Sequence, residues 1–149
     1  MLPTCDDPPP AALLAGIAQF NRQEYFECHE TLETIWMREP GTIRRLYQGI
    51  LQIGVGFYHL GHQNYRGTLN LLASGIAYLE PFAPRCRGID VDHLIGAARS
   101  VRATVTELGA ARIAEFDLSA LPRILVYAPV QLPAEEHPIA APEPGPGHW

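Results

Sequence analysis

Lysine is absent from this 149-residue chain, and all 11 basic residues are arginines. Its absence excludes Schiff-base chemistry and the lysine of a phosphate-binding loop, and it leaves no lysine-rich tract for nucleic acid. The sequence also has no GxSxG element, dinucleotide fingerprint or CxxC pair. The formal charge of -5 comes from acidic residues at the two ends of the chain, so the body is balanced and has no basic stripe. We therefore expect no binding to nucleic acid.

A signal peptide and a membrane-spanning run are missing as well. The first ten residues are acidic and contain four prolines, which differs from the basic and then apolar start of a signal peptide. The longest apolar stretch, residues 43–60, carries two arginines, two glutamines and a histidine. Each charge would cost about 2.5 kcal/mol or more at membrane depth. We expect this stretch to be a helix of a soluble bundle, with no contact to a membrane.

Cysteine is scarce and its spacing is uninformative for pairing. The three cysteines, Cys5, Cys28 and Cys86, are odd in number and widely separated. Such a pattern favours free thiols in a reducing compartment over a disulfide framework, so we expect a cytoplasmic protein. Cys28 falls on the apolar stripe of a predicted helix, which predicts an inert, buried thiol.

Proline marks both ends of the chain. Four prolines fall in the first ten residues and six more occur from Pro129 onward. This composition predicts a flexible segment over residues 1–10 and a disordered, proline-rich tail over residues 129–149. Residues 11–128 show a succession of helical patterns and no run of alternating β-branched residues. They predict one all-α domain, a compact bundle of about five helices.

The periodicity of apolar residues places these helices at about 10–22, 24–38, 42–62, 64–79 and 92–108. The third is apolar nearly all round and is therefore expected to be the buried central helix of the bundle.

Several local signals refine this assignment. Gly49, Gly54 and Gly56 would let other helices approach the third helix closely. Thr42 and Asn64 are the expected N-caps of the third and fourth helices. The stretch 118–130 predicts either a short strand or an extended strap across the bundle.

Polar side chains recur on the second and third predicted helices. His29 and Glu33 are i,i+4 neighbours, about 5 to 6 Å apart at Cβ, and point the same way. The third helix has a polar stripe made of Arg45, Gln48, Gln52 and His59. Because a short link joins the two helices, they should pack antiparallel with their stripes facing. Glu33 would then meet an arginine or glutamine near the link, with His29 opposite a point farther along.

Three interpretations of these stripes stay open. A polar group buried without a partner costs about 1 to 3 kcal/mol, so the first and favoured interpretation is a buried hydrogen-bonded network that fixes helix register. The second is a pocket for a small ligand or partner group. The third is a divalent metal held by His29, Glu33 and His59, although HExxE is not the zinc-protease HExxH. We expect no cofactor under the first two. The candidate residues are His29, Glu30, Glu33, Trp36, Arg45, Gln48, Gln52, His59 and Asn64.

The spacing of these polar residues also resembles that of a known family. The string FNRQEYFECHETLETIW contains HExxExxW, and it is followed by a QGILQ segment, by His59 and by an N-x-x-G turn at Asn64. Over about residues 15–79 the chain resembles the bacterial and archaeal family called domain of unknown function 309. The resemblance implies a small all-helical domain and no established activity.

Two functions from different classes follow. The first is a non-enzymatic binding or assembly module with an unknown protein or small-molecule partner; exposed apolar and glycine positions also make a homodimer possible. The alternative is a metal-dependent hydrolase with His29, Glu33 and His59 as ligands and with Glu30 or Gln52 in support. Arg44, Arg45 and Arg66 could in addition form a small anion site.

Overall fold

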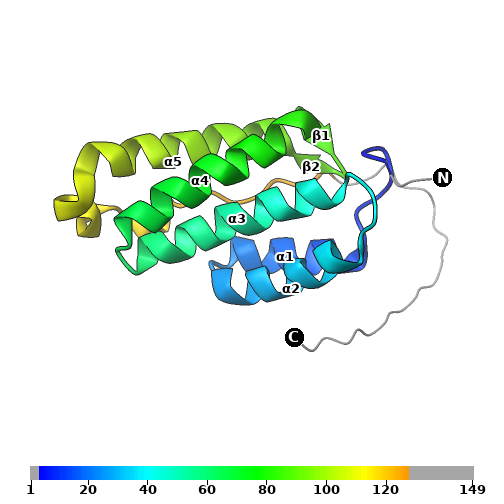
Figure 1. Cartoon of the computed structure of the whole chain (residues 1–149), viewed down its shortest axis with the longest axis horizontal. Coiled ribbons are helices and arrows are strands. Elements are labelled where there is room, and N and C mark those ends of the chain that lie inside the picture. The colour runs from blue at the N-terminus through cyan, green and yellow to red at the C-terminus, as the bar shows by residue number, and fades with distance from the viewer. Residues whose placement is uncertain (1–3, 128–149) are drawn as a thin grey trace.

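The computed structural model describes residues 4–127, and five α-helices make up most of this part of the chain (Figure 1). They are α1 (Ala11–Asn21), α2 (Tyr25–Arg38), α3 (Arg44–Gly61), α4 (Tyr65–Leu79) and α5 (Val91–Arg112). Short 3-10 turns follow at Glu80–Phe82, Ile113–Glu115 and Leu118–Ala120. Helices that follow one another in the sequence pack side by side, with α3 between α2 and α4. The all-α prediction is confirmed. The predicted tail over residues 129–149 lies outside the described residues.

The helix ends agree with the sequence at one cap and differ at another. Asn64 caps α4 as predicted, because its Oδ1 accepts a hydrogen bond from the Gly67 amide at 2.9 Å. The prediction for Thr42 is wrong: α3 begins at Arg44 without a side-chain cap. The Thr42 carbonyl instead accepts from the Arg45 amide at 2.9 Å in the turn before the helix.

Three aromatic rings join the first three helices in the core. Phe20 of α1, Tyr25 of α2 and Phe57 of α3 have ring centroids 5.3 to 5.7 Å apart. Two of the three pairs meet edge to face, the arrangement that aromatic rings favour. Each ring is at most 6% exposed, so the cluster fixes how α2 enters the bundle.

Glycines allow α3 and α4 to lie close together. A Cβ at Gly49 would stand 2.7 Å from a Leu79 methyl carbon, and one at Gly75 would stand 3.0 Å from the Gly49 carbonyl oxygen. A Cβ at Gly56 would meet Leu72 at 2.8 Å. The predicted close approach is thus confirmed at Gly49 and Gly56. Gly54 differs, since a Cβ there would make only ordinary contact with Phe20 at 3.6 Å.

A two-stranded hairpin connects α4 to α5 and was not predicted. Strands β1 (Arg85–Cys86) and β2 (Ile89–Asp90) pair antiparallel. The turn residues Arg87 and Gly88 have φ values of 54° and 77°, and positive φ at both positions is typical of a type I′ hairpin.

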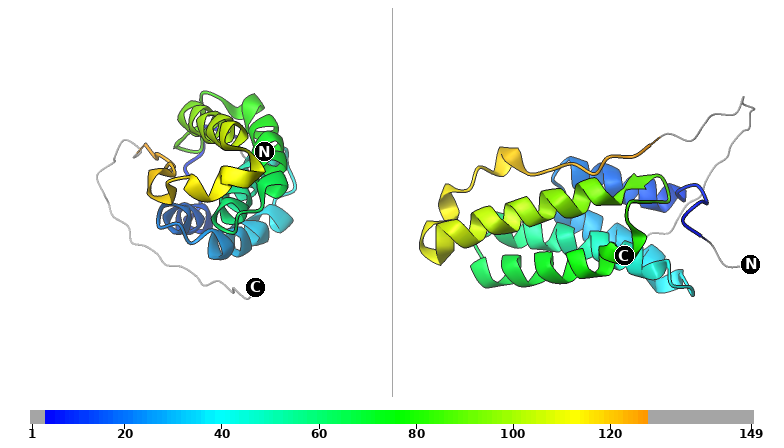
Figure 2. Two further views of the ribbon diagram at one scale, coloured as in Figure 1. Left: turned by 90° about the vertical axis from the view of Figure 1, so that its left-hand side faces the viewer. Right: turned by 90° about the horizontal axis from the view of Figure 1, so that it is seen from above.

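The C-terminal part of the described chain runs back along the bundle to this hairpin (Figure 2). Asn21 at the end of α1 exchanges hydrogen bonds with the Ile124 backbone, at 2.7 and 3.0 Å. Farther along, Val126 forms a β-bridge with Ile89. The predicted strap over 118–130 is therefore confirmed as far as residue 127.

A disulfide joins Cys5 to Cys86, and this corrects the expectation of free thiols. The two cysteines are 81 residues apart in sequence, but residues 4–9 pass over the hairpin and bring their Cα atoms to 4.3 Å. The contacts of this segment were not expected from its proline content. Cys28 is the free cysteine of the described part of the chain; it is buried as predicted, and burial raises the pKa of its thiol to about 12.

Within residues 4–127, none of the helices combines the length and the apolar character that crossing a membrane requires.

Candidate functional site

The polar stripes of α2 and α3 are not buried, contrary to the sequence prediction. His29, Glu33, Gln48, Gln52 and His59 are all half-buried, and Arg45 and Asn64 are exposed. The reason is that α2 and α4 cover the two sides of α3 but leave a stripe of its outer face open to solvent. The apolar face of α3, including Ile50 and Ile53, points into the core.

Residues of the polar stripe on α3 form hydrogen bonds to both neighbouring helices, α2 and α4. Gln48 Oε1 accepts a hydrogen bond from Trp36 Nε1 of α2 at 3.3 Å, whereas Gln52 Oε1 accepts one from Ser74 Oγ of α4. The contact predicted for Glu33 is therefore made by Trp36, one turn nearer the link. The Arg44 guanidinium also stacks over the Trp36 ring, 4.4 Å from its centroid. These contacts join α3 to α2 at Trp36 and to α4 at Ser74.

His29 and His59 line one small pocket of about 140 Å³ between α2 and α3. Its walls are Tyr25, Phe26, His29, Val55, Tyr58 and His59. Glu33 lies 4.0 Å from His29 Nε2, and both side chains are partly exposed, so this pair is a weak one. Among residues 4–127, no three side chains of His, Cys, Asp or Glu lie together as a metal site, and the predicted set of His29, Glu33 and His59 is not assembled.

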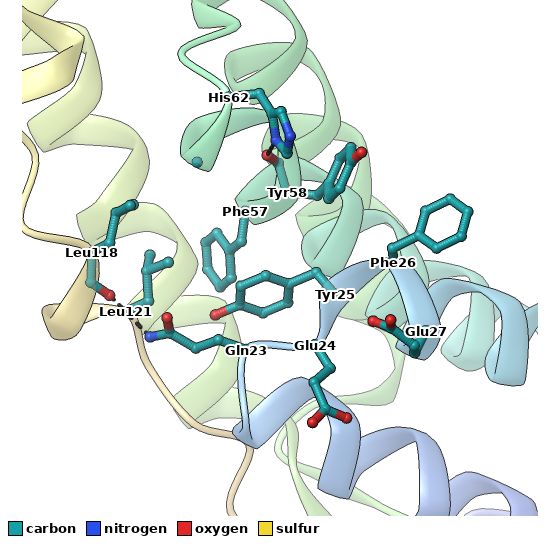
Figure 3. Close-up of a pocket in the computed structure, with 11 residues that line it drawn as sticks. Gln23, Glu24, Tyr25, Phe26, Glu27, Phe57, Tyr58, His62, Leu118 and Leu121 are labelled. Carbon is teal, nitrogen blue, oxygen red and sulfur yellow. Dashed lines mark hydrogen bonds between the residues drawn. The ribbon is translucent and has the colours of Figure 1, made fainter.

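A larger pocket of about 390 Å³ adjoins the smaller one (Figure 3). It is formed by the start of α2, the end of α3 and the segment around Leu118 and Leu121. The two pockets share Tyr25, Phe26 and Tyr58. A hydrogen bond of 2.9 Å from Gln23 Nε2 to the Leu118 carbonyl joins the segment to the turn before α2.

Aromatic and imidazole rings gather around the two pockets. We call Phe26, His29, Tyr58, His59 and His62 the aromatic–histidine surface. The centroid of the Phe26 ring lies 6.0 Å from that of Tyr58 and 6.1 Å from that of His29. The centroid of the Tyr58 ring lies 4.4 Å from that of His62 and 6.1 Å from that of His59. Phe26 is half exposed, at 50%. The surface is therefore both concave and partly apolar.

The polar atoms of this region have definite hydrogen-bonding roles. His62 Nδ1 lies 3.0 Å from the Tyr58 carbonyl, which can only accept, so a neutral His62 leaves Nε2 free to accept. The amide nitrogen of Asn64 lies 3.3 Å from His59 Nδ1, so a neutral His59 carries its proton on Nε2 and can donate there.

Tyr25 adds a third polar atom, at the inner wall of the larger pocket. Its hydroxyl is buried and has no hydrogen-bond partner within the described part of the chain. Burial raises the pKa of Tyr25 well above its ordinary value, with a smaller effect from the Cys28 thiol, so the hydroxyl stays protonated at neutral pH.

The whole aromatic–histidine surface lies in a stretch that matches a family model. Residues 13–71 match the model described as "Domain of unknown function (DUF309)". This stretch is a DUF309 domain. The chain is also 34% identical over 86 residues to the uncharacterised protein YpuF of Bacillus subtilis (strain 168). That alignment covers 56% of this chain and 49% of YpuF, so the chain spans about half the length of this curated relative. The resemblance predicted from HExxExxW is thus confirmed.

The DUF309 domain contains both predicted and unpredicted residues of the pockets. His29 and His59 were predicted, whereas Tyr58 and His62 were not; their signal is an i,i+4 pair of rings beside His59. Leu118 and Leu121 lie beyond the domain, and no local pattern predicts their place in the larger pocket.

The remaining candidates lie outside both pockets. Glu30, Trp36, Arg45, Gln48 and Gln52 line neither of them, and Asn64 acts through His59. Arg66 lies in the first turn of α4, at the opposite end of α3 from Arg44 and Arg45, so the three arginines do not form the predicted anion site.

Proposed function

We propose that this chain is a non-enzymatic binding module whose aromatic–histidine surface receives a small apolar group of a ligand or a protein partner. One observation carries this proposal: two adjacent pockets share three aromatic side chains, Tyr25, Phe26 and Tyr58. A single exposed apolar residue is ordinary on a protein surface, but apolar walls around a concave site are typical of binding sites.

The polar atoms around the pockets supply the orientation that a binding site needs. The Tyr25 hydroxyl and His59 Nε2 can donate hydrogen bonds, and His62 Nε2 can accept one. A few polar groups on apolar walls fix how a ligand lies, while the rings supply most of the contact area. The Tyr25 hydroxyl is buried, so a ligand reaches it only if the side chains that cover it move aside.

The hydrolase alternative has no comparable support. It requires His29, Glu33 and His59 on one metal ion, and the described residues do not assemble such a group. The other polar candidates bridge helices in separate pairs, Trp36 with Gln48 and Gln52 with Ser74. We interpret these pairs as contacts that hold α2, α3 and α4 in register.

The proposal is tested by titrating the full chain with small apolar compounds while recording amide and aromatic NMR spectra. The set contains matched neutral, cationic and anionic compounds, each with one aromatic or branched aliphatic group. We expect shifts confined to Tyr25, Phe26, Tyr58 and their neighbours. Phe26→Ala should weaken binding at least tenfold, because it removes the most exposed of the three rings that the two pockets share.

A matched control is available on the same helix. Met37 is 68% exposed and lies in neither pocket, so Met37→Ala should bind as the original chain does. Equal loss in both variants, or shifts spread over the whole bundle, would contradict the proposal. If the molecular mass in solution rises with protein concentration for the original chain but not for Phe26→Ala, the partner is a second copy of the chain.

A further inference from the structure

A buried arginine lies beneath the N-terminal segment, at the hairpin end of the molecule. Arg87 is 4% exposed. Its Nε donates to the Thr4 carbonyl at 2.8 Å, one terminal nitrogen donates to the Tyr47 hydroxyl at 3.1 Å, and the other lies 3.9 Å from an Asp7 carboxylate oxygen. A buried guanidinium is costly unless acceptors surround it, and two of its three partners here belong to the N-terminal segment.

The disulfide is the strongest link between this segment and the rest of the molecule. It attaches Cys5 to Cys86, directly beside Arg87, whose backbone amide donates to the Cys5 carbonyl at 2.8 Å. The segment has no large apolar anchor, and Thr4, Asp6, Asp7 and Pro8 are all exposed. Ordering each residue of a chain costs about as much as one hydrogen bond contributes, so these few contacts do not hold the segment without the disulfide.

We propose that residues 4–10 are a redox-held cover over an anion-binding site made of Arg87 and the Tyr47 hydroxyl. The Thr4 carbonyl and the Asp7 carboxylate occupy the places that an external carboxylate or phosphate group takes once the cover leaves. Asp7 is the carboxylate that pairs with Arg87 among the described residues, so its departure leaves a cation able to bind another anion.

A dithiol reductant opens the cover. Two electrons and two protons pass to the Cys5 and Cys86 sulfurs, which become two thiols, while the reductant becomes a disulfide. The site uses residues remote from the aromatic–histidine surface, so it does not rest on the binding function proposed above.

The release of the cover is tested by amide hydrogen exchange on the full chain, oxidised and after reduction with dithiothreitol. We expect the Arg87 amide, which donates to the Cys5 carbonyl, to exchange at least tenfold faster after reduction. The Asp90 amide is the matched control, because it lies in the same hairpin but donates to Leu125 at 2.9 Å. It should be unchanged.

Two other outcomes would contradict the proposal that the disulfide holds this cover in place. Unchanged exchange at Arg87 means that the segment stays in place without the disulfide. Equal acceleration at Arg87 and Asp90 means that the whole hairpin opens. Cys5→Ser repeats the test without a reductant and should behave as the reduced chain.

Anion binding is tested by titrating inorganic phosphate, and separately acetate, at constant ionic strength while following the side-chain NMR signals of Arg87. We expect saturable shifts in the reduced chain, with affinity at least tenfold higher than in the oxidised chain. The two probes distinguish a phosphate from a carboxylate ligand. Tyr47→Phe keeps the ring and should weaken binding severalfold in the reduced chain. Equal binding in both redox states, or no binding of either anion after reduction, would contradict the proposed anion site.

Discussion

Phe57 belongs both to the core and to the candidate binding site, whereas Phe26 belongs to the site alone. Phe57 is 1% exposed and contacts the rings of Phe20 and Tyr25, while Phe26 is 50% exposed. Truncating a buried aromatic ring costs about 3 to 5 kcal/mol, so Phe57→Ala should lower the free energy of unfolding by that amount. Phe26→Ala should change it by less than about 1 kcal/mol. Urea unfolding measures both, and equal losses would place Phe26 in the core.

Among residues 4–127 the Tyr25 hydroxyl has no hydrogen-bond partner, and this predicts an unusual effect of its removal. A buried hydroxyl without a partner costs about 1 to 3 kcal/mol, so Tyr25→Phe should leave the unfolding free energy at pH 7 unchanged or raise it. Because burial raises the pKa of Tyr25, the folded chain keeps this proton when the unfolded chain loses it, above pH about 10.

The contribution of the protonated Tyr25 to the free energy of unfolding is therefore fully present below pH about 10, and it falls as the pH rises further. The fall should be shallower in Tyr25→Phe than in the original chain. Urea unfolding at pH 7 and pH 10.5 measures the difference. A large loss at pH 7 would show that the hydroxyl has a partner after all.

At the scale of helices, the contact between α3 and α4 depends on closely packed glycines, among them Gly49. A Cβ at Gly49 would lie 2.7 Å from Leu79, so Gly49→Ala should destabilise the fold by about 1 to 3 kcal/mol. Gly96 in α5 is the control, because a Cβ there meets nothing within 4 Å. Gly96→Ala should stabilise the fold by up to about 1 kcal/mol, since alanine favours a helix. Thermal unfolding compares them, and shifts of the same sign would contradict the packing described.

The helices could be predicted because their signals are local. The start of α4 follows from Asn64, and the end of α2 from the Pro40–Gly41 pair that follows it. The exposure of the polar stripe on α3 could not be predicted, because the periodicity of a helix does not reveal how many neighbouring helices cover it. The Cys5–Cys86 pairing depends on a path between residues 81 positions apart, and no local pattern records it.

At the scale of the whole molecule, the disulfide joins the N-terminal segment to strand β1 of the hairpin. Closing a loop of 81 residues stabilises a fold by about 4.5 kcal/mol in the chain-entropy model. Reduction should therefore lower the urea concentration at the midpoint of unfolding, while the chain keeps its helices in the absence of urea. Cys5→Ser should unfold at this lower midpoint with or without reductant. An unchanged midpoint on reduction would show that the crosslink adds no stability.

The two proposed sites lie at opposite ends of α3. Tyr47 is in the first turn of this helix and Tyr58 in its last, and an α-helix rises about 1.5 Å per residue. Packed helices rather than a shared pocket separate the sites. We therefore expect reduction of the disulfide to leave ligand binding at the aromatic–histidine surface unchanged.

The position of a bound compound tests the binding function most directly. Intermolecular nuclear Overhauser effects can be recorded between the full chain and the tightest-binding compound of the titration. We expect contacts from the apolar group of that compound to the rings of Phe26 and Tyr58. Contacts instead to Thr104 and Phe116, which line a separate pocket of about 360 Å³ beside α5, would place binding elsewhere and contradict it.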